Sequence, residues 1–125
     1  MIVLDFKSSK PIYEQIIEQM KFHILKGHLK SGDAIPSVRK LALDLSITPG
    51  TVAKAYQELE RSHMIETIRG KGTFIAGNIE IKPDEDKIRE SKKQMRSAIL
   101  ELKVMGLSEE EVIQFVHEIF EEMSV

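Results

Sequence analysis

Apolar residues recur at helical spacing along most of this chain. Residues 11–26 place isoleucine or methionine at every fourth position from Ile12 to Ile24, which predicts an amphipathic helix. Pro11 suits the start of that helix, because its φ is already set and its missing N–H costs no hydrogen bond there. Gly27 suits the C-terminal cap.

Two further helices are predicted close together. Ser37 caps an apolar pattern that continues to Leu45. Thr48, whose side chain we expect to cap the first N–H groups, begins the next helix, which runs to Arg61. A turn of three to four residues between two helices predicts a helix-turn-helix. The last helix packs along one side, and its opposite side carries small or hydrogen-bonding groups at Gly50, Lys54, Gln57 and Arg61.

A short β-hairpin is predicted directly after this motif. The β-prone runs 64–69 and 73–76 are separated by the glycine-rich residues 70–72. A hairpin in this position is a wing. Its tip offers Arg69 and Lys71 beside backbone without side chains, which suits close approach to a phosphate backbone or a narrow groove.

Two other segments of the N-terminal part are less regular. Residues 27–36 form a loop that leaves room for a short strand at about 33–35. Residues 1–9 are apolar without helical periodicity, so they are extended or packed against another element, and the sequence does not place them.

The C-terminal part predicts a helical hairpin. Residues 79–86 have the composition of a linker, and a helix follows over about 83–105, ended by Gly106. A capping box at 108–111 begins a last helix with a wide apolar stripe.

A helical hairpin of this length is below the size that usually folds alone. Its apolar stripes therefore need a partner surface, and a second copy of the chain is the simplest one. We thus divide the chain into a winged helix-turn-helix DNA-binding domain over 1–78 and a helical dimerisation or effector domain over 79–125. The residues expected to form the dimer interface are Ile88, Met95, Ile99, Leu102, Val112, Phe115, Val116, Ile119 and Phe120.

Composition narrows the class of protein. The chain has 125 residues and no cysteine, which excludes a disulfide framework and thiolate metal sites. We find no apolar run long enough to span a membrane and no secretory signal, and therefore expect a cytoplasmic protein that does not bind membranes. The predicted fold class is mainly α with a small β-hairpin wing.

Charge is divided unevenly along the chain. Residues 1–77 carry 11 Lys and Arg against 8 Asp and Glu, a net charge of +3. Residues 78–125 carry 7 against 12, a net charge of −5. The asymmetry favours a phosphate-binding N-terminal part and a solubilising or pairing C-terminal part, although ordinary variation of surface charge is the alternative.

The winged helix-turn-helix predicts binding to duplex DNA, because an α-helix fits the major groove and its N-terminal residues reach base edges. Tyr56 could stack on a sugar, but its place between Val52 and Leu59 favours core packing. The expected DNA-contacting residues are Ser37, Arg39, Lys40, Thr48, Gly50, Thr51, Lys54, Arg69, Gly70, Lys71 and Gly72.

Little in the sequence indicates a catalytic site or a metal site. His117 and Glu121 lie four residues apart on the last helix, but a pair without a third ligand is more often a solvated surface pair. No catalytic triad, phosphate-binding loop or paired carboxylate stands out. We expect no metal, no cofactor and no enzymatic activity.

Three separated blocks carry a resemblance to a known family: GxLxxGDxIPSxRxLA from residue 27, TVxxAYxxLE from residue 51 and GxGTF from residue 70. In this order and spacing they resemble the DNA-binding domain of GntR-family transcriptional regulators. Residues 49–61, PGTVAKAYQELER, and the short helical tail are most similar to the YtrA subfamily. That resemblance implies a dimeric repressor, often one that controls transporter genes.

The resemblance also implies DNA contacts from Arg39, from Thr51 and from the wing at residues 69, 70 and 72. Two positions depart from the family pattern. Pro49 stands where many relatives have an arginine, and Lys54 would compensate for that contact. Residues 62–63, Ser-His, stand where the wider family has an acid and a glycine, which leaves the turn before the wing open.

Two functional interpretations follow. The first is a dimeric repressor whose recognition helices enter successive major grooves, about 34–36 Å apart, at an inverted-repeat operator. The alternative is a winged-helix adaptor for protein interactions, which would not need cations at groove-facing positions. The sequence identifies no effector; any small-molecule site is expected between protomers or between the two domains.

Overall fold

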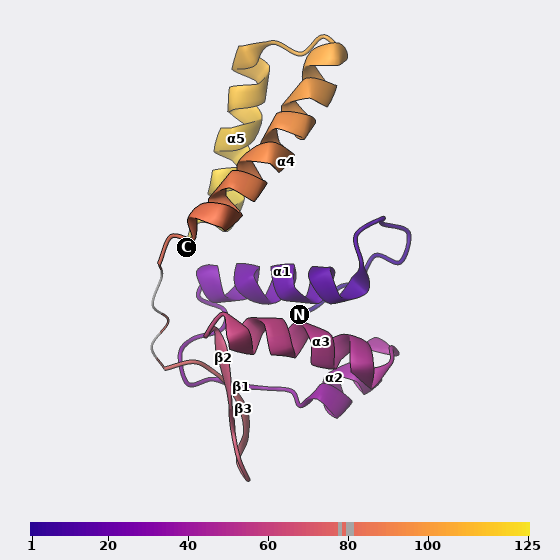
Figure 1. Ribbon diagram of the computed structural model, residues 1–125, viewed down its shortest axis with the longest axis vertical. Coiled ribbons are helices and arrows are strands. Elements are labelled where there is room, and N and C mark those ends of the chain that lie inside the picture. Colours follow the sequence, from indigo (N-terminus) through magenta and orange to yellow (C-terminus); the bar gives the residue numbers. More distant parts are fainter. Residues whose placement is uncertain (78, 80–81) are drawn as a thin grey trace. The chain divides into compact units, whose positions relative to one another are not determined.

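The computed structural model describes residues 1–77, 79 and 82–125 (Figure 1). The chain divides into two compact units, Met1–Glu80 and Ile81–Ser124. The predicted domain boundary at residue 78 and part of the predicted linker lie outside the described residues.

The first unit contains three helices and three short strands. Its elements in chain order are α1 (Ile12–Leu25), β1 (Ala34–Ile35), α2 (Val38–Leu45), α3 (Pro49–Arg61), β2 (Ile65–Ile68) and β3 (Gly72–Ile75). Helices α1 and α3 lie side by side, and the hairpin of β2 and β3 extends away from them (Figure 1). This is the winged helix-turn-helix that the sequence predicts.

The strands form one antiparallel sheet in the order β1-β3-β2. In the wing, Thr67 is opposite Thr73 and Ile65 is opposite Ile75. The predicted short strand exists as β1, and it pairs with β3 with Ala34 opposite Phe74. The loop before α2 is thereby attached to the base of the wing.

One apolar core holds these elements together. It combines the apolar sides of α1 and α3 with the strand residues at the base of the wing. Fully burying a side chain of this kind contributes about 1.5–3 kcal/mol to stability. The largest fully buried side chains are Ile16, Met20, Val52, Leu59, Ile65 and Ile75.

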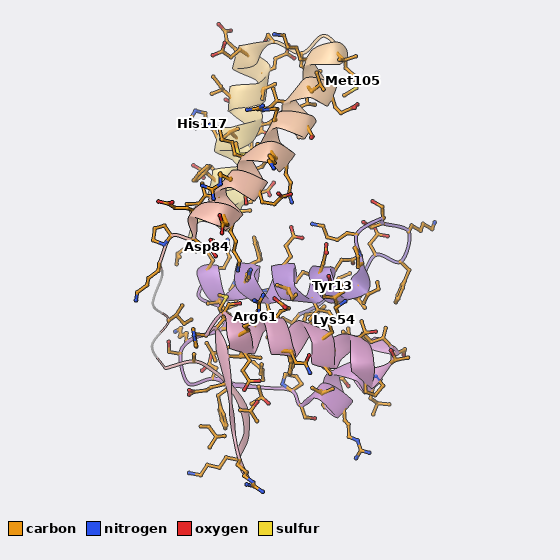
Figure 2. All side chains as sticks on the ribbon, viewed as in Figure 1. Tyr13, Lys54, Arg61, Asp84, Met105 and His117 are labelled. Carbon is orange, nitrogen blue, oxygen red and sulfur yellow. The ribbon has the colours of Figure 1, made fainter. Side chains whose placement is uncertain are left out.

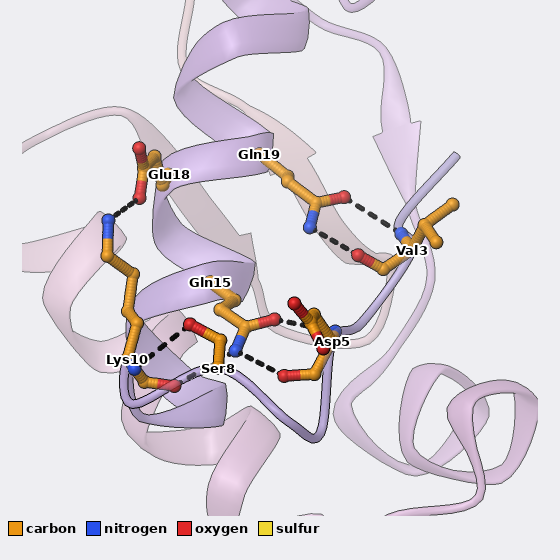
Figure 3. A network of polar contacts seen from close by, with 7 residues as sticks. All are labelled: Val3, Asp5, Ser8, Lys10, Gln15, Glu18 and Gln19. Carbon is orange, nitrogen blue, oxygen red and sulfur yellow. Dashed lines mark hydrogen bonds and ion pairs between the residues drawn. The ribbon is translucent and has the colours of Figure 1, made fainter.

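The N-terminal segment, which the sequence did not place, is bound along α1. Ile2 is buried in the core. Gln19 pairs with the main chain of Val3 in both directions: its Nε2 donates to the carbonyl at 2.6 Å and its Oε1 accepts from the N–H at 2.8 Å (Figure 3). Gln15 does the same with Asp5, at 2.9 Å each way. The two glutamine side chains thus make the paired main-chain hydrogen bonds that a neighbouring strand would otherwise make.

The second unit is a pair of helices, α4 (Glu85–Val104) and α5 (Glu109–Met123). Helix α4 begins two residues later than predicted, because the carboxylate of Asp84 caps it by accepting from the N–H groups of Asp86 and Lys87. Gly106 ends the turn after α4 at φ +93°, as predicted. The predicted capping box is present at Ser108 and Glu111.

Candidate nucleic-acid interface

The start of α2 is fixed by its cap. The Oγ of Ser37 accepts a hydrogen bond from the backbone N–H of Lys40 at 3.1 Å, so this hydroxyl supports the helix. The ammonium of Lys40 lies 2.9 Å from the carboxylate of Asp44, one turn later. Arg39 is exposed, and no carboxylate of the described residues pairs with it. Arg39 is therefore the residue of this group whose charge is uncompensated.

The start of α3 differs in one detail from the prediction. Pro49 takes the first helical position, but the side chain of Thr48 caps no backbone N–H. Its hydroxyl lies 3.0 Å from the hydroxyl of Thr51 instead. The prediction that Thr48 caps the helix through its side chain is wrong, because the two hydroxyls bond to each other. They form one small polar patch at the first turn.

Beside this patch the recognition helix has an open position. A Cβ added at Gly50 would meet no atom of the described residues within 4 Å. The glycine is therefore not required by packing inside the chain, and its φ is not in the left-handed region. A missing side chain on an exposed first turn leaves the backbone free for close approach by a ligand.

Two cations lie further along the exposed side of α3. The guanidinium of Arg61 donates to Glu58 at 2.6 Å, and this hydrogen bond raises the pKa of Arg61. The ammonium of Lys54 lies 3.9 Å from the centroid of the Tyr13 ring, which belongs to α1 (Figure 2). No pattern in the sequence predicts this role of Tyr13, because a contact between two helices that are far apart in the chain has no periodicity.

Tyr56 belongs to the core, as the sequence favoured. Its side chain is buried, and its hydroxyl donates to the carbonyl of Pro36 at 2.6 Å. Burial raises the pKa of Tyr56 to about 12. This hydrogen bond connects α3 to the residue directly before the cap of α2, so it helps to set the geometry of the helix-turn-helix.

The tip of the wing is a tight turn closed by a hydrogen bond from the N–H of Lys71 to the carbonyl of Ile68 at 2.9 Å. Gly70 has φ +80° in this turn, a conformation that glycine adopts without strain. Arg69 and Lys71 are exposed on either side of it, and neither pairs with a carboxylate within the described ranges.

All of the predicted DNA-contacting residues lie in the first unit. Except for the half-buried Thr51, each of them is exposed. They form three groups, at the start of α2, along α3 and at the tip of the wing. Within these groups Ser37, Lys40 and Lys54 have contacts inside the chain, whereas Arg39, Arg69 and Lys71 keep free charges among the residues described.

The predicted dimer interface is an apolar surface in the second unit. None of the described residues of α4 and α5 is buried. Phe120 is 73% exposed and Ile88 is 55% exposed. Leu102 and Val112 are half-buried, and the other predicted residues, Met95, Ile99, Phe115, Val116 and Ile119, are exposed.

We also searched the described part of the chain for a metal site and for a membrane-spanning helix. His117 and Glu121 have no further ligand near them, and the described residues contain no group of three or more His, Cys, Asp or Glu placed to hold a metal ion. No described helix combines the length and the apolar composition that a membrane span requires.

Comparison with known proteins agrees with this geometry. The family described as "Bacterial regulatory proteins, gntR family" matches residues 12–75. The HTH-type transcriptional repressor YtrA of Bacillus subtilis (strain 168) is 46% identical over 119 residues, covering 95% of this chain and 92% of the repressor.

Two solved structures extend the comparison. A structure described as a transcriptional antiterminator from Listeria monocytogenes EGD-e has a TM-score of 0.87 and 38% identity, and the alignment covers 98% of this chain and 92% of that one. The DNA-binding domain of AraR, solved in complex with operator ORR3, has a TM-score of 0.52 and 26% identity over 59% of this chain and 89% of that domain. The chain therefore belongs to the gntR family of bacterial regulatory proteins, and it is a DNA-binding transcriptional regulator of the YtrA type rather than an enzyme.

Proposed function

We propose that this regulator represses transcription by binding an inverted-repeat operator as a homodimer, with α3 of each protomer in the major groove. The observation that carries the proposal is the exposed side of α3, where Gly50 and the two bonded hydroxyls of Thr48 and Thr51 are followed by Lys54. A recognition helix reads base edges with its N-terminal residues, and this first turn is free of bulky side chains.

The free cations on either side of α3 support a phosphate backbone as the partner. Arg39 lies at the start of α2, and Arg69 and Lys71 lie at the tip of the wing. Contacts to phosphates position a protein on duplex DNA without reading its sequence. We assign these three residues to backbone contacts, with the wing residues flanking the groove that α3 enters.

Homodimer formation is supported by the apolar surface of α4 and α5. Side chains such as Phe115 and Phe120 are exposed there, and apolar patches of this kind mark interaction sites. A two-fold dimer presents the same patch from both protomers. It would also place two recognition helices on successive major grooves, about 34–36 Å apart, which predicts a palindromic operator.

In this proposal repression results from occupation of a promoter; the Bacillus subtilis relative is named a transcriptional repressor. Regulation of transporter genes is part of the proposal through the resemblance to the YtrA subfamily. Binding to chromosomal DNA would support a cytoplasmic location. An effector would relieve repression by favouring a dimer with a different spacing of its two DNA-binding units, since a ligand shifts an equilibrium only by its differential affinity.

The test of DNA binding is a mobility-shift titration of the full chain at two salt concentrations. The probe is a duplex enriched from a random library by the wild-type protein. Because each neutralised phosphate contributes a slope of about −0.9 to the dependence of log K on log salt, binding should weaken steeply as salt rises. Weak binding that is indifferent to salt would contradict the proposal and favour the protein-interaction adaptor.

The wing is tested by Arg69→Ala and Lys71→Ala. Each substitution should make the salt slope shallower by about 1 and weaken binding to all sequences alike. Lys87→Ala, an exposed lysine of α4, is the charge-matched control and should leave the slope unchanged. An unchanged slope in both wing variants would remove the wing from the interface.

The dimer is tested by Phe120→Glu, with mass measured by light scattering after size exclusion. A charge in a buried apolar interface should yield monomers, because an unpaired charge is costly to desolvate. Gln114→Glu adds the same charge to the side of α5 opposite the apolar stripe and should stay dimeric. If Phe120→Glu remains a dimer, or the wild type is a monomer, the pairing surface is not the one proposed.

A further inference from the structure

Lys54 of α3 and Tyr13 of α1 form a contact that the helix-turn-helix itself does not require. The ammonium lies over the face of the ring, 3.9 Å from its centroid, and both side chains are visible between the two helices in Figure 2. Lys54 is exposed, whereas Tyr13 is half-buried and its hydroxyl lies 3.3 Å from Glu14. Contacts of this type at exposed sites shift an equilibrium by a factor of roughly two to five.

An aromatic ring holds a cation without neutralising it. Two other lysines of the first unit have carboxylate partners: Lys10 pairs with Glu18, and Lys40 pairs with Asp44. No such partner pairs with Lys54 among the residues that the structure describes. The ring therefore restrains a long flexible side chain and leaves its full positive charge available to an anion.

Restraint matters because ordering a long, flexible lysine side chain on binding costs rotamer entropy. A lysine that is already held when the protein is free does not lose this entropy again on binding.

The position of the restraint matters as well. Gly50 and Gln57 lie near the middle of the exposed side of α3. The contact with Tyr13 holds the ammonium of Lys54 away from this middle, at the edge that faces α1.

We propose that Tyr13 is a positioning residue for DNA binding: its ring holds Lys54 at the α1 edge of the recognition helix, where the ammonium meets a backbone phosphate and not a base. The inference rests on the proposed function. A helix in the major groove has base edges beneath its middle and phosphates along its edges. Tyr13 thus acts through Lys54, and it contributes to affinity for every sequence alike.

The experiment compares the full-length wild type with Tyr13→Phe, Tyr13→Leu, Lys54→Met and the double variant Tyr13→Leu/Lys54→Met. Affinity is measured by fluorescence anisotropy on the duplex enriched by the wild type, across a salt series. Tyr13→Phe keeps the ring face and should bind within twofold of the wild type. Tyr13→Leu should weaken binding about two- to fivefold, because the ring can favour the bound position of the lysine by no more than the strength of an exposed cation–π contact.

The double variant separates positioning from packing. Lys54→Met should make the salt slope shallower by about 1, and adding Tyr13→Leu to it should cause no further loss. A loss of the same size in the Lys54→Met background would overturn the proposal, because Tyr13 would then act through the packing of α1. Reselection from the random library with Tyr13→Leu should return the wild-type sequence; a changed preference would contradict the phosphate assignment.

An NMR measurement on the wild type tests the proposal without variants, any of which could fold poorly. In the proton NMR spectrum, the ε-methylene of Lys54 should be shifted upfield by the Tyr13 ring current, both in the free protein and in the DNA complex. Loss of the shift in the complex would show that the lysine leaves the ring, which overturns positioning. If the wild type itself fails to bind DNA in a salt-dependent way, the proposed function fails first, and the ring-current shift in the free protein still reports the contact.

Discussion

The hydroxyl of Tyr56 donates a hydrogen bond to the carbonyl of Pro36 at 2.6 Å, and this contact joins the recognition helix to the chain that enters α2. The side chain of Tyr56 is only 5% exposed. One residue after Pro36, Ser37 caps α2 and so orients the first turn that carries Arg39. The angle between the two helices of the motif therefore depends on an interaction in the core as well as on the turn between them.

Removal of this hydroxyl should destabilise the protein. Tyr56→Phe leaves the Pro36 carbonyl without its donor, which costs about 1–2 kcal/mol. In a unit of this size, each kcal/mol of lost stability lowers Tm by roughly 4–8 °C. Tyr13→Phe is the matched control, because its hydroxyl has only an exposed contact 3.3 Å long. Equal melting temperatures for the wild type and Tyr56→Phe would show that the hydrogen bond contributes nothing net.

Stability should also fall in alkali because of the same residue. Burial raises the pKa of Tyr56 from 10.0 to about 12, so the folded state holds this proton more tightly than the unfolded state. The contribution is fully present below pH 10 and is lost as pH rises toward 12, by an amount on the order of 2–3 kcal/mol. Chemical denaturation across this range measures the loss.

The tyrosinate absorbance of Tyr13→Phe provides the control, because the chain has two tyrosines and Tyr56 is then the one that titrates. Its midpoint should lie near pH 12 while the protein is folded, and at about 10 in denaturant. A midpoint of 10 in the folded protein would contradict the burial argument.

Glycine signals in the sequence identified some helix ends and missed others. Gly27 and Gly106 end α1 and α4 with positive φ, as predicted. Ser46 and His63 adopt the same left-handed conformation after α2 and α3, at φ 55° and 60°, without being glycine. In each case the N–H of the residue itself and the N–H of the next residue bond back to carbonyls near the end of the helix. These backbone hydrogen bonds impose the left-handed conformation, which the residue type does not predict.

The turn before the wing holds His63 in a conformation that glycine would adopt without strain. The N–H of His63 bonds to the carbonyl of Glu60 at 3.0 Å, and the N–H of Met64 bonds to that of Leu59 at 2.9 Å. His63→Gly should therefore stabilise the protein by about 0.5–1 kcal/mol, since a left-handed residue with a Cβ carries about 1–2 kcal/mol of strain, partly offset by the entropy of glycine in the unfolded chain.

Chemical denaturation measures this gain. Ser62→Gly is the contrasting control, because Ser62 has a negative φ and its Oγ donates to the carbonyl of Glu58 at 2.6 Å. It should destabilise the protein by about 1 kcal/mol. If both glycine substitutions change stability in the same direction, backbone strain at His63 is not the cause.

Periodicity and turn chemistry predicted the elements of the winged helix, but not the side-chain contacts that connect them. The spacing of apolar residues located α1 and α3, because each of these helices buries one regular face. The wing was located by β-prone runs on either side of a glycine-rich turn. The pairing of Gln19 with Val3 and the contact of Lys54 with Tyr13 join residues far apart in the chain. Such contacts depend on how helices are placed in space, which a one-dimensional pattern does not specify.

Gly50→Ala should separate folding from DNA recognition. The added methyl group meets no atom of the described chain within 4 Å, and alanine is favoured over glycine in a helix by up to about 1 kcal/mol. Thermal stability should therefore be equal or slightly higher. Binding to the enriched duplex should weaken roughly tenfold or change its sequence preference, because the methyl occupies space that the DNA needs at the first turn of α3. Melting curves and anisotropy titrations on the same samples provide both readings. Unchanged affinity with unchanged preference would mean that the backbone at Gly50 does not approach the bases, and that base reading begins at Thr51.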